Sequence, residues 1–452
     1  MNSKRLVCIG GNAAGMSAAS RAKRIDPSLD ILVLEKSPFI SYSICGVPYF
    51  VEGLVNEVDR LIRFTPETLW KDRQIRARTG YEVLEIVPAR RLLVGRDLQT
   101  GQNESIPYDS LLISTGYIPI IPPLEGLDGP NVYTLSNLDD GLNLRELVEK
   151  RPPGRAVVVG GGYIGLSMAQ SLRHLGWQVD VVEKNSAVYP SLDADMSALV
   201  EEELKKNSVG IQLSNPARGL RRDADGTLRG VALEHGSLDC DLTLVDIGIV
   251  PNVELARSAG IPLGATGAIA VNERMETGTP GIFAAGNCAE TLHLVSRRPA
   301  LSALGTAASK QGRIAGENMA GRRGVFSGIL GTAVSGVFDL TVAQSGLSSE
   351  AAAEAGFRPG VSRVSVPSRA GYFPGVRPVT LKLIFDQPSR RVLGAQIIGD
   401  ALVAKRIDVV AAVLTAGMRL EDVAQLDLAY APPYAPLWDP LLVAANVALR
   451  EQ

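Results

Sequence analysis

Residues 156–183 read AVVVGGGYIGLSMAQSLRHLGWQVDVVE, and residues 5–35 read RLVCIGGNAAGMSAASRAKRIDPSLDILVLE. Each stretch runs from a short apolar segment through a glycine cluster into a helical pattern. Each then ends in a second apolar segment that is closed by a glutamate. The sequence therefore predicts the same unit twice: a strand, a glycine loop, a helix and a second strand. Such units are the building blocks of an α/β fold.

The spacing of the glycines has a physical reason. The first glycine permits a tight turn, the second lets a pyrophosphate approach the backbone, and the third lets the helix pack close to the strand. The helix N-terminus offers free N–H groups to phosphates, and the closing glutamate can accept hydrogen bonds from ribose hydroxyls. The later loop has all three glycines, Gly160, Gly162 and Gly165, whereas Asn12 occupies the middle position of the earlier one. Two such units predict two dinucleotide sites.

The closing glutamates, Glu35 and Glu183, favour nucleotides without a 2′-phosphate, since a phosphate there would meet like charge. Lys184, next to Glu183, leaves NADPH open as an alternative to NADH. Two further segments, Tyr108–Gly116 and Thr277–Asn287, read as strands that end in glycine, as strands that close over a cofactor do.

The composition limits the class of protein. The 452 residues correspond to roughly three domains. Lys and Arg total 46 against 48 Asp and Glu, a net charge of −2, which argues against a nucleic-acid or anionic-membrane binder. Only three histidines are present, so we expect no metal centre.

The four cysteines, Cys8, Cys45, Cys240 and Cys288, are scattered without metal-type spacing. They form no disulfide framework, which predicts a reducing, cytoplasmic location. The N-terminus lacks the apolar segment of a signal peptide, and no apolar run reaches the roughly 20 residues of a membrane helix.

The C-terminal quarter differs in pattern from the rest of the chain. It reads as β-branched strands at Val361–Ser368, Arg377–Phe385 and Arg391–Ile398, followed by helices at Ala401–Ala416 and Leu437–Ala448. Because this region has no phosphate-binding loop of its own, we expect an α+β domain that serves dimerisation.

With these motifs in place, the whole chain resembles the pyridine nucleotide–disulfide oxidoreductase superfamily. The segment Ser41–Tyr49 (SYSICGVPY) carries one cysteine, Cys45, and Phe50 stands where most of these reductases have a second. That pattern resembles the branch of coenzyme A-disulfide reductases, NADH-dependent persulfide reductases, NADH oxidases and NADH peroxidases. The oxidases and peroxidases carry a histidine where this chain has Ala13, so the first glycine loop is more similar to the coenzyme A-disulfide and persulfide reductases.

The resemblance implies an α/β fold with two Rossmann-like dinucleotide-binding domains, one for FAD and one for NAD(P), plus a C-terminal α+β dimerisation domain. Residues 1–117 and 246–324 would form the FAD-binding domain in two parts. Residues 118–245 would bind NAD(P), and residues 325–452 would form the interface of a homodimer.

The resemblance also implies which residues hold the cofactors. For FAD they are Gly10, Gly11, Ala14, Gly15, Glu35, Lys36, Ser41, Thr115, Gly116, Gly286, Asn287, Thr306 and Ala307. For NADH or NADPH they are Gly160, Gly162, Tyr163, Ile164, Gly165 and Glu183. Three positions depart from the family. Asn287 replaces an aspartate and so binds the ribityl chain without charge assistance, Ser167 replaces a glutamate near the nicotinamide, and Ile44 replaces an asparagine of many coenzyme A-disulfide reductases.

Cys45 is the expected catalytic residue. Pro48 favours the first turn of a helix, which would place Cys45 at a helix N-terminus where the dipole stabilises a thiolate. The expected reaction passes a hydride from NAD(P)H to the flavin, and then electrons to a mixed disulfide or persulfide on Cys45. Tyr372 and Tyr430 match tyrosines that the family projects from the partner subunit, where either could protonate the leaving thiolate.

Coenzyme A is an expected substrate or bound thiol, and its phosphates need cations. Arg21 and Arg24, on the helix after the first glycine loop, are the candidates, with Lys71 or Arg73 in reserve; a solvated basic helix face is the alternative interpretation. Ile44 puts coenzyme A itself in question, so other small disulfides, persulfides or thiols stay open.

Three other functions fit parts of the pattern. An NADH oxidase or peroxidase would use a Cys45 sulfenic acid, against which Ala13 argues. A relative repurposed for a xenobiotic disulfide would explain Ser167 and Asn287. A flavin redox sensor without turnover is the non-enzymatic alternative, which the complete nucleotide loop and active-cysteine motif disfavour.

Overall fold

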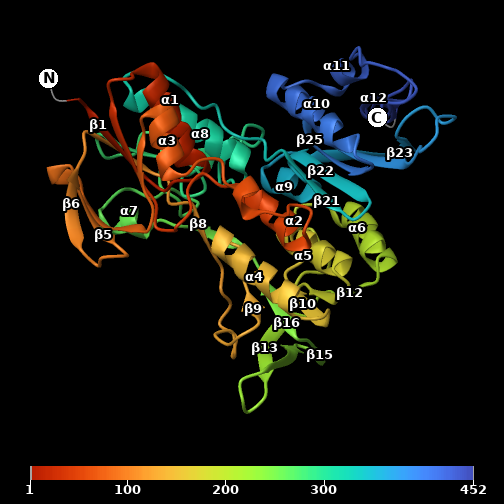
Figure 1. The fold of residues 1–452 in the computed structure, drawn as a ribbon. Helices are drawn as coiled ribbons and strands as arrows, with labels where there is room; N and C mark the ends of the chain where they lie inside the picture. The colour runs from red at the N-terminus through yellow and green to blue at the C-terminus, as the bar shows by residue number, and fades with distance from the viewer. Residues whose placement is uncertain (1–2, 451–452) are drawn as a thin grey trace.

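The computed structural model describes residues 3–450. It contains three units, seen in Figure 1 at the left, at the bottom and at the upper right. Two units are built on parallel sheets and the third on an antiparallel sheet. The expected α/β architecture with a separate C-terminal unit is therefore confirmed. No helix between residues 3 and 450 is both long and apolar enough to cross a membrane.

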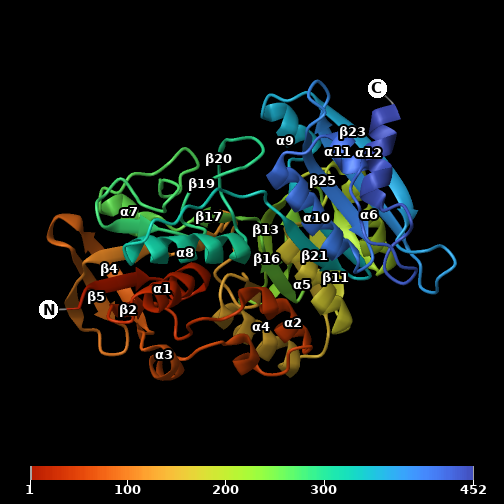
Figure 2. The same cartoon turned by 90° about the horizontal axis from the view of Figure 1, so that it is seen from above.

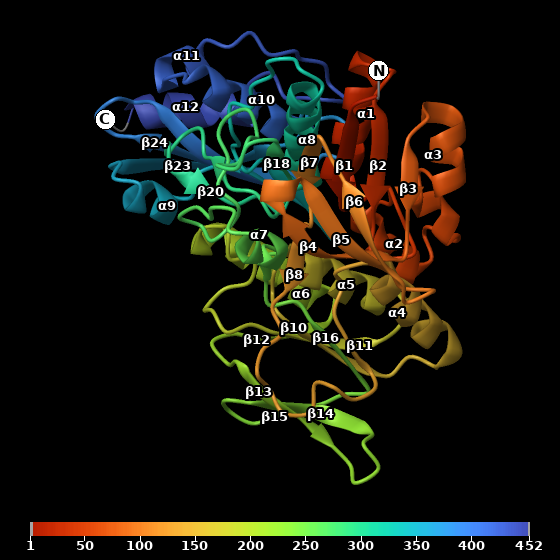
Figure 3. The same ribbon diagram turned by 90° about the vertical axis from the view of Figure 1, so that its left-hand side faces the viewer.

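The first parallel sheet has the strand order β18-β7-β1-β2-β3, which Figure 3 shows from one side. Helix α1 connects β1 to β2, as the first glycine motif predicts. The bounds are β1 Arg5–Ile9, α1 Ala13–Ile25, β2 Asp30–Leu34, β3 Arg76–Arg78, β7 Ser110–Ile113 and β18 Ile282–Ala284. Strand β18 pairs with β7 although it comes almost 170 residues later in the chain. Segments that are distant in sequence are therefore neighbours in this sheet.

Helix α8 (Gly305–Met319) crosses α1 at very short range, and Figure 2 shows the two side by side. A Cβ atom at Gly312 would lie 2.1 Å from the Ala14 carbonyl oxygen, and one at Gly316 would lie 2.3 Å from that of Ala18. Only glycine permits this approach, so two residues of α8 set its distance from the helix of the first glycine motif.

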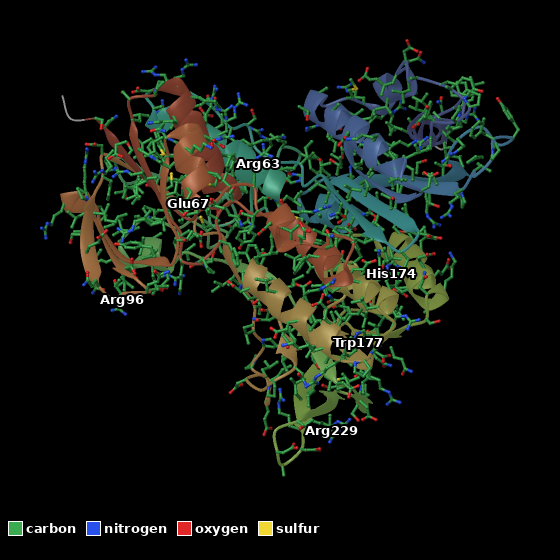
Figure 4. All side chains as sticks on the ribbon, in the orientation of Figure 1. Arg63, Glu67, Arg96, His174, Trp177 and Arg229 are labelled. Atoms are coloured by element: carbon green, nitrogen blue, oxygen red, sulfur yellow. The ribbon has the colours of Figure 1, made fainter. Side chains whose placement is uncertain are left out.

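The second parallel sheet has the order β12-β11-β10-β16-β9. Its core includes Trp177, which is 2% exposed and is labelled in Figure 4. The second glycine motif lies between β10 and α5, as predicted. The bounds are β9 Val132–Tyr133, α4 Leu138–Lys150, β10 Arg155–Val159, α5 Tyr163–His174, β11 Gln178–Val182, α6 Ala194–Lys206, β12 Val209–Gln212 and β16 Leu242–Val245.

Two chain segments connect the first unit to the second, and they pair with each other. Strand β8 (Tyr117–Pro119) runs antiparallel to β17 (Ile249–Pro251). Each unit also carries a three-stranded antiparallel sheet that the sequence did not predict. These are β4 Tyr81–Val87, β5 Leu92–Asp97 and β6 Asn103–Pro107 in the first unit, and β13 Ala217–Arg222, β14 Leu228–Leu233 and β15 Ser237–Asp239 in the second.

The third unit is an antiparallel sheet of order β21-β22-β25-β24-β23 covered by helices. The three predicted strands are confirmed as β23, β24 and β25, and the final helix starts at Pro440 rather than at Leu437. The bounds are β21 Ala333–Val337, β22 Leu340–Gly346, α9 Ser349–Glu354, β23 Pro359–Pro367, β24 Pro378–Asp386, β25 Val392–Gly399, α10 Val403–Ala416, α11 Leu420–Ala424 and α12 Pro440–Arg450.

Candidate functional site

One edge of the first sheet gathers most of the residues predicted to hold FAD. Since β1, β2, β7 and β18 are parallel, their carboxyl ends meet at this edge. They present Gly10, Glu35, Thr115 and Gly286 in turn. Glu35 accepts a hydrogen bond of 2.7 Å at Oε2 from the Gly11 N–H, which fixes the carboxylate against the loop.

The geometry of this edge fits a dinucleotide. Gly10 has φ +100°, and a Cβ atom there would lie 2.2 Å from the Ser114 carbonyl oxygen. The glycine loop therefore packs directly against the backbone of Ser114, in a conformation that favours glycine. Gln311 on α8 accepts the Gly286 N–H at 2.8 Å through Oε1, while its buried Nε2 has no partner among the described residues. A buried donor without a partner is what a missing polar ligand leaves behind.

Other predicted FAD residues lie around the same edge. The Ser41 N–H donates to the Gly11 carbonyl at 2.8 Å, and the Thr115 hydroxyl donates to the Asn252 carbonyl at 2.6 Å. The Lys36 ammonium lies 2.8 Å from Glu82, so its charge already has a protein partner. The remaining members follow their predicted elements: Ala14 and Gly15 in the first turn of α1, Gly116 after β7, Asn287 after β18, and Thr306 and Ala307 in the first turn of α8.

The second glycine loop repeats this geometry. Gly160 has φ +116°, and a Cβ atom there would lie 1.9 Å from the Asp246 carbonyl oxygen. Glu183 accepts the Gly161 N–H at 2.8 Å, as Glu35 accepts that of Gly11. The other oxygen of Glu183 accepts both the backbone N–H and the side-chain amide of Asn185, at 2.9 and 2.7 Å. The buried carboxylate is thereby fixed in direction.

A cavity of about 680 Å³ opens over this loop. The predicted nucleotide residues Gly160, Gly162, Tyr163, Ile164 and Glu183 line it, together with Lys184 and Asp246. Gly165 lies directly beneath, with its N–H donating to Asp246 at 2.9 Å. The structure thus places the NAD(P) candidates in one concave site, in the crevice position typical of doubly wound sheets.

Cys45 is the only exposed cysteine of the four. It lies in a 3₁₀ turn, η1 (Ile44–Gly46), directly before helix α2 (Val47–Glu52), which carries Pro48 in its first turn. Burial raises the pKa of the Cys8 thiol to about 12 and also raises the pKa values of Cys240 and Cys288. Of the four thiols, Cys45 is therefore the one that a substrate can reach.

Two tyrosines join Cys45 to the cavity. Burial, followed by the nearby Tyr117 and Cys45, raises the pKa of Tyr163 to about 12. Burial and Cys45 likewise raise the pKa of Tyr117. Both tyrosines line the cavity, and Cys45 lies close enough to both to raise their pKa values. Tyr117 was missed in the sequence because it belongs to the connecting strand β8, outside both glycine motifs.

Helix α2 is also attached to α5, the helix of the second glycine loop. The Glu52 carboxylate, at the end of α2, lies 2.6 Å from Nδ1 of His174 (labelled in Figure 4). The Ser171 hydroxyl lies 3.2 Å both from the other Glu52 oxygen and from the Pro48 carbonyl. Ser167 bonds back to the Tyr163 carbonyl at 2.8 Å. The segment of Cys45 thus rests on the helix that follows the nucleotide loop.

Tyr372 and Tyr430 form a pair on the surface of the C-terminal unit. Tyr372 is 77% exposed and Tyr430 is 45% exposed, and a hydrogen bond between the two hydroxyls raises the pKa of Tyr430. Their two segments meet where the Ala370 N–H donates to the Pro432 carbonyl at 3.3 Å. Figures 1 and 2 place the segment between β23 and β24 at the outer side, away from α2. Within one chain, this segment lies on a different side of the molecule from the helix that follows Cys45.

The candidate coenzyme A cations separate into two kinds. Arg21 is ion-paired with Glu317 at 2.6 Å. Arg24 instead donates to the Ser20 carbonyl at 3.1 Å, and Arg73 donates to the Ser20 hydroxyl at 2.7 Å. Arg63 and Arg73 both stack on the ring of Phe64, and Figure 4 labels Arg63 beside α3 (Pro66–Arg73). Arg24 and Arg73 therefore converge on one residue.

Comparison with known families agrees with this geometry. A family model described as pyridine nucleotide-disulphide oxidoreductase matches residues 4–312, and the model of its dimerisation domain matches residues 332–440. The chain belongs to the pyridine nucleotide-disulphide oxidoreductase family. It is an NAD(P)H-dependent oxidoreductase of the flavin disulfide reductase class, for which the family implies FAD and NAD(P)H.

Three individual proteins show which members of the family this chain is similar to. The chain is 37% identical to the NAD(P)H coenzyme A polysulfide/persulfide reductase of Pyrococcus horikoshii, over 98% of both chains. It is 34% identical to an NADH oxidase of Methanocaldococcus jannaschii, over 99% of both chains. Among solved structures, the NAD-dependent persulfide reductase from A. fulgidus superposes with a TM-score of 0.96 at 39% identity, covering 99% of this chain and 83% of that one.

Proposed function

We propose that this protein uses NAD(P)H to reduce a low-molecular-weight disulfide or persulfide of the coenzyme A type through Cys45. The observation that carries the proposal is the single exposed thiol, which lies near two tyrosines that line the nucleotide cavity. A bound FAD would supply the two-electron carrier between nicotinamide and sulfur. The coenzyme A-dependent persulfide reductase among the relatives supports the same substrate class.

The proposed reaction balances around the thiol. The Cys45 thiolate attacks one sulfur of the substrate, so that a Cys45 mixed disulfide or persulfide forms and one thiolate leaves. Two electrons from NAD(P)H then cleave the new S–S bond and restore Cys45. One disulfide, one NAD(P)H and one proton give two thiols and NAD(P)⁺; a persulfide gives one thiol and sulfide.

Phosphates of coenzyme A would be held by Arg24 and Arg73. Both side chains are anchored on Ser20 without a carboxylate partner among the described residues, and a guanidinium binds phosphate in a bidentate manner. Arg21 contributes less, because Glu317 already neutralises it.

The active form would be a homodimer, in which the Tyr372–Tyr430 pair of a second copy faces Cys45. The match to a dimerisation domain and the exposure of both tyrosines support this arrangement. We assign residues 1–117 and 246–324 to the FAD-binding domain, residues 118–245 to the NAD(P)-binding domain and residues 325–452 to the interface domain.

The decisive variant is Cys45→Ser. We expect it to retain FAD absorbance and to lose at least about 10³-fold in kcat with coenzyme A disulfide and coenzyme A persulfide. Cys240→Ser, which changes a buried thiol that contacts the Thr243 hydroxyl, is the matched control and should retain turnover. Undiminished turnover by Cys45→Ser would remove this thiol from the reaction.

A second candidate function is NADH oxidation by oxygen or peroxide through a Cys45 sulfenic acid. The NADH oxidase among the relatives favours it, whereas Ala13 lacks the imidazole expected beside such an acid. Peroxide-dependent NADH consumption that exceeds consumption with the disulfide panel would select this function over the first.

A further inference from the structure

Asp246 is a half-buried carboxylate at the nucleotide site that no motif explains. It directly follows β16, the strand beside β10, and its N–H donates to the Val159 carbonyl at 2.8 Å. Its Oδ2 accepts the Gly165 N–H at 2.9 Å, and the residue lines the cavity. A strand end distant in sequence thus places a negative charge directly beside the second glycine loop.

This carboxylate lies at the N-terminus of α5. The N-cap residue is Gly162, which has no side chain to offer, and the first turn contains no acidic residue. Asp246 therefore supplies the capping oxygen from another element. The same helix end is the place where a dinucleotide puts its pyrophosphate, because free N–H groups and the helix dipole attract anions there. Two anions are thus assigned to one helix end.

The surroundings do not neutralise Asp246. From α5 and β8 it is faced by the phenols of Tyr163 and Tyr117, next to which lies Cys45. Glu183, just beyond the end of β11, is a second carboxylate near the loop and accepts a hydrogen bond from the Gly161 N–H. Lys184 lines the same cavity, but it forms no ion pair with Asp246. No Lys or Arg among residues 3–450 forms a salt bridge with Asp246. Burial raises the pKa of this carboxyl above its ordinary value.

We propose that Asp246 is an internal anion that competes with the pyrophosphate of NAD(P)H for the N-terminus of α5, so that the dinucleotide binds with uptake of one proton at this carboxyl. The inference rests on the proposed function, in which this cavity takes NAD(P)H. A protonated Asp246 carries no charge and lets the pyrophosphate approach. Ionised Asp246 repels it, so affinity should fall by up to about tenfold per pH unit between the carboxyl pKa values of the free and the bound protein.

The test is calorimetric titration of the oxidised, FAD-loaded protein with NAD⁺ and with ADP-ribose, which bind without turnover. The range is from about pH 5.5 to about pH 8.5, where free carboxyls and phenols do not titrate. Titrations in phosphate and in Tris, which differ in ionisation enthalpy, count the protons taken up. We expect uptake approaching one proton and weaker binding at higher pH in the wild type.

Asp246→Asn keeps an oxygen that can accept the Gly165 N–H but cannot ionise. We expect this variant to bind NAD⁺ at least about tenfold tighter than the wild type at the upper end of the range, with a flat pH profile and no proton uptake. Asp180→Asn is the matched control. Burial also raises the pKa of the Asp180 carboxyl, but Asp180 lies within β11 and not at the N-terminus of α5. It should behave as the wild type.

Three results would overturn the inference. They are wild-type binding without proton uptake, an Asp246→Asn variant with the wild-type pH slope, and an Asp246→Asn variant that binds more weakly at every pH, as loss of a ribose acceptor would cause. The first needs no variant, so a misfolded substitution does not remove the test. A wild type that binds neither ligand at any pH overturns the assigned nucleotide cavity as well, which distinguishes failure of the proposed function from failure of this inference alone.

Discussion

The hydroxyl of Tyr430 differs from that of an ordinary surface tyrosine, because Tyr372 is bonded to it and raises its pKa. A tyrosine hydroxyl is protonated at neutral pH with or without this contact, so Tyr430 could give a proton to a departing thiolate in the proposed dimer. We expect Tyr430→Phe to lower kcat for disulfide reduction by about 10²-fold without loss of FAD. Tyr434→Phe, a neighbouring tyrosine that is 70% exposed, should leave kcat unchanged. Equal rates for both variants would remove Tyr430 from the mechanism.

At the same scale, the sequence was sufficient for some site residues and not for others. Glu35 and Glu183 could be singled out because each closes the strand that follows its glycine loop, and the structure places each beside that loop, with hydrogen bonds of 2.7 and 2.8 Å to a loop N–H. Asp246 could not be predicted, because it is 81 residues from its partner Gly165. Only the pairing of β10 with β16 brings the two together.

Among the elements, the close crossing of α1 and α8 positions the two helices whose first turns carry residues predicted to bind FAD. A side chain at Gly312 would meet the Ala14 backbone at 2.1 Å, and overpacking of this kind costs about 1–3 kcal/mol. We expect Gly312→Val to lower the melting temperature and the FAD content of the purified protein. Gly305→Ala, on the same helix with open space around its Cβ position, is the control. Full FAD occupancy in Gly312→Val would show that the crossing does not control the cofactor site.

A second element contact joins the nucleotide unit to the C-terminal sheet. Lys382 on β24 lies 2.7 Å from both Asp193 and Asp195, at the start of α6. Burial alone would raise the pKa of Asp193, but hydrogen bonds from Lys382 and Ser349 hold it below its ordinary value. The carboxylate therefore stabilises the fold above its ordinary pKa range, and this stabilisation is lost as the pH falls through the lowered value.

We accordingly expect Lys382→Met to cost about 3 kcal/mol at neutral pH, since it leaves a buried carboxylate without its cation. The deficit in melting temperature should shrink as the pH is lowered toward the carboxyl range. Lys405→Met removes a lysine whose side chain is 89% exposed, paired with Asp408, and should change little. A pH-independent deficit would mean that packing, not charge, explains the effect of Lys382.

The elements that could be predicted are those with strong local patterns. The two strand–loop–helix units and β23 to β25 alternate or cluster apolar residues clearly, and the structure confirms them. The sheets β4-β5-β6 and β13-β14-β15 escaped prediction because their strands have one exposed face and mixed polar residues, as in Asn103–Pro107, where only Ile106 is buried. Their pairing depends on neighbours across the sheet rather than on local periodicity.

For the whole molecule, the proposed homodimer makes a prediction, because the Tyr372–Tyr430 pair of one copy would complete the site at Cys45 of the other. Cys45→Ser and the double variant Tyr372→Phe/Tyr430→Phe should each be nearly inactive alone. Mixed as unfolded chains and refolded together with FAD, they should recover about a quarter of wild-type activity, because half of the random dimers have one intact site of two. Activity that stays at the level of the parents would contradict a site shared between copies.

The paired strands β8 and β17 have a further consequence for how such a chain can be rebuilt. Tyr117 lies opposite Pro251, and Pro119 lies opposite Ile249, so the chain leaves the first unit and returns to it at one place. The intervening segment behaves as a cassette with adjacent ends. A nucleotide-binding segment of different coenzyme preference could be spliced between these strands without altering the length of the ribbon. The graft would need to keep Ser171 and His174, which contact α2, and Asp193 and Asp195, which contact Lys382 of the C-terminal sheet.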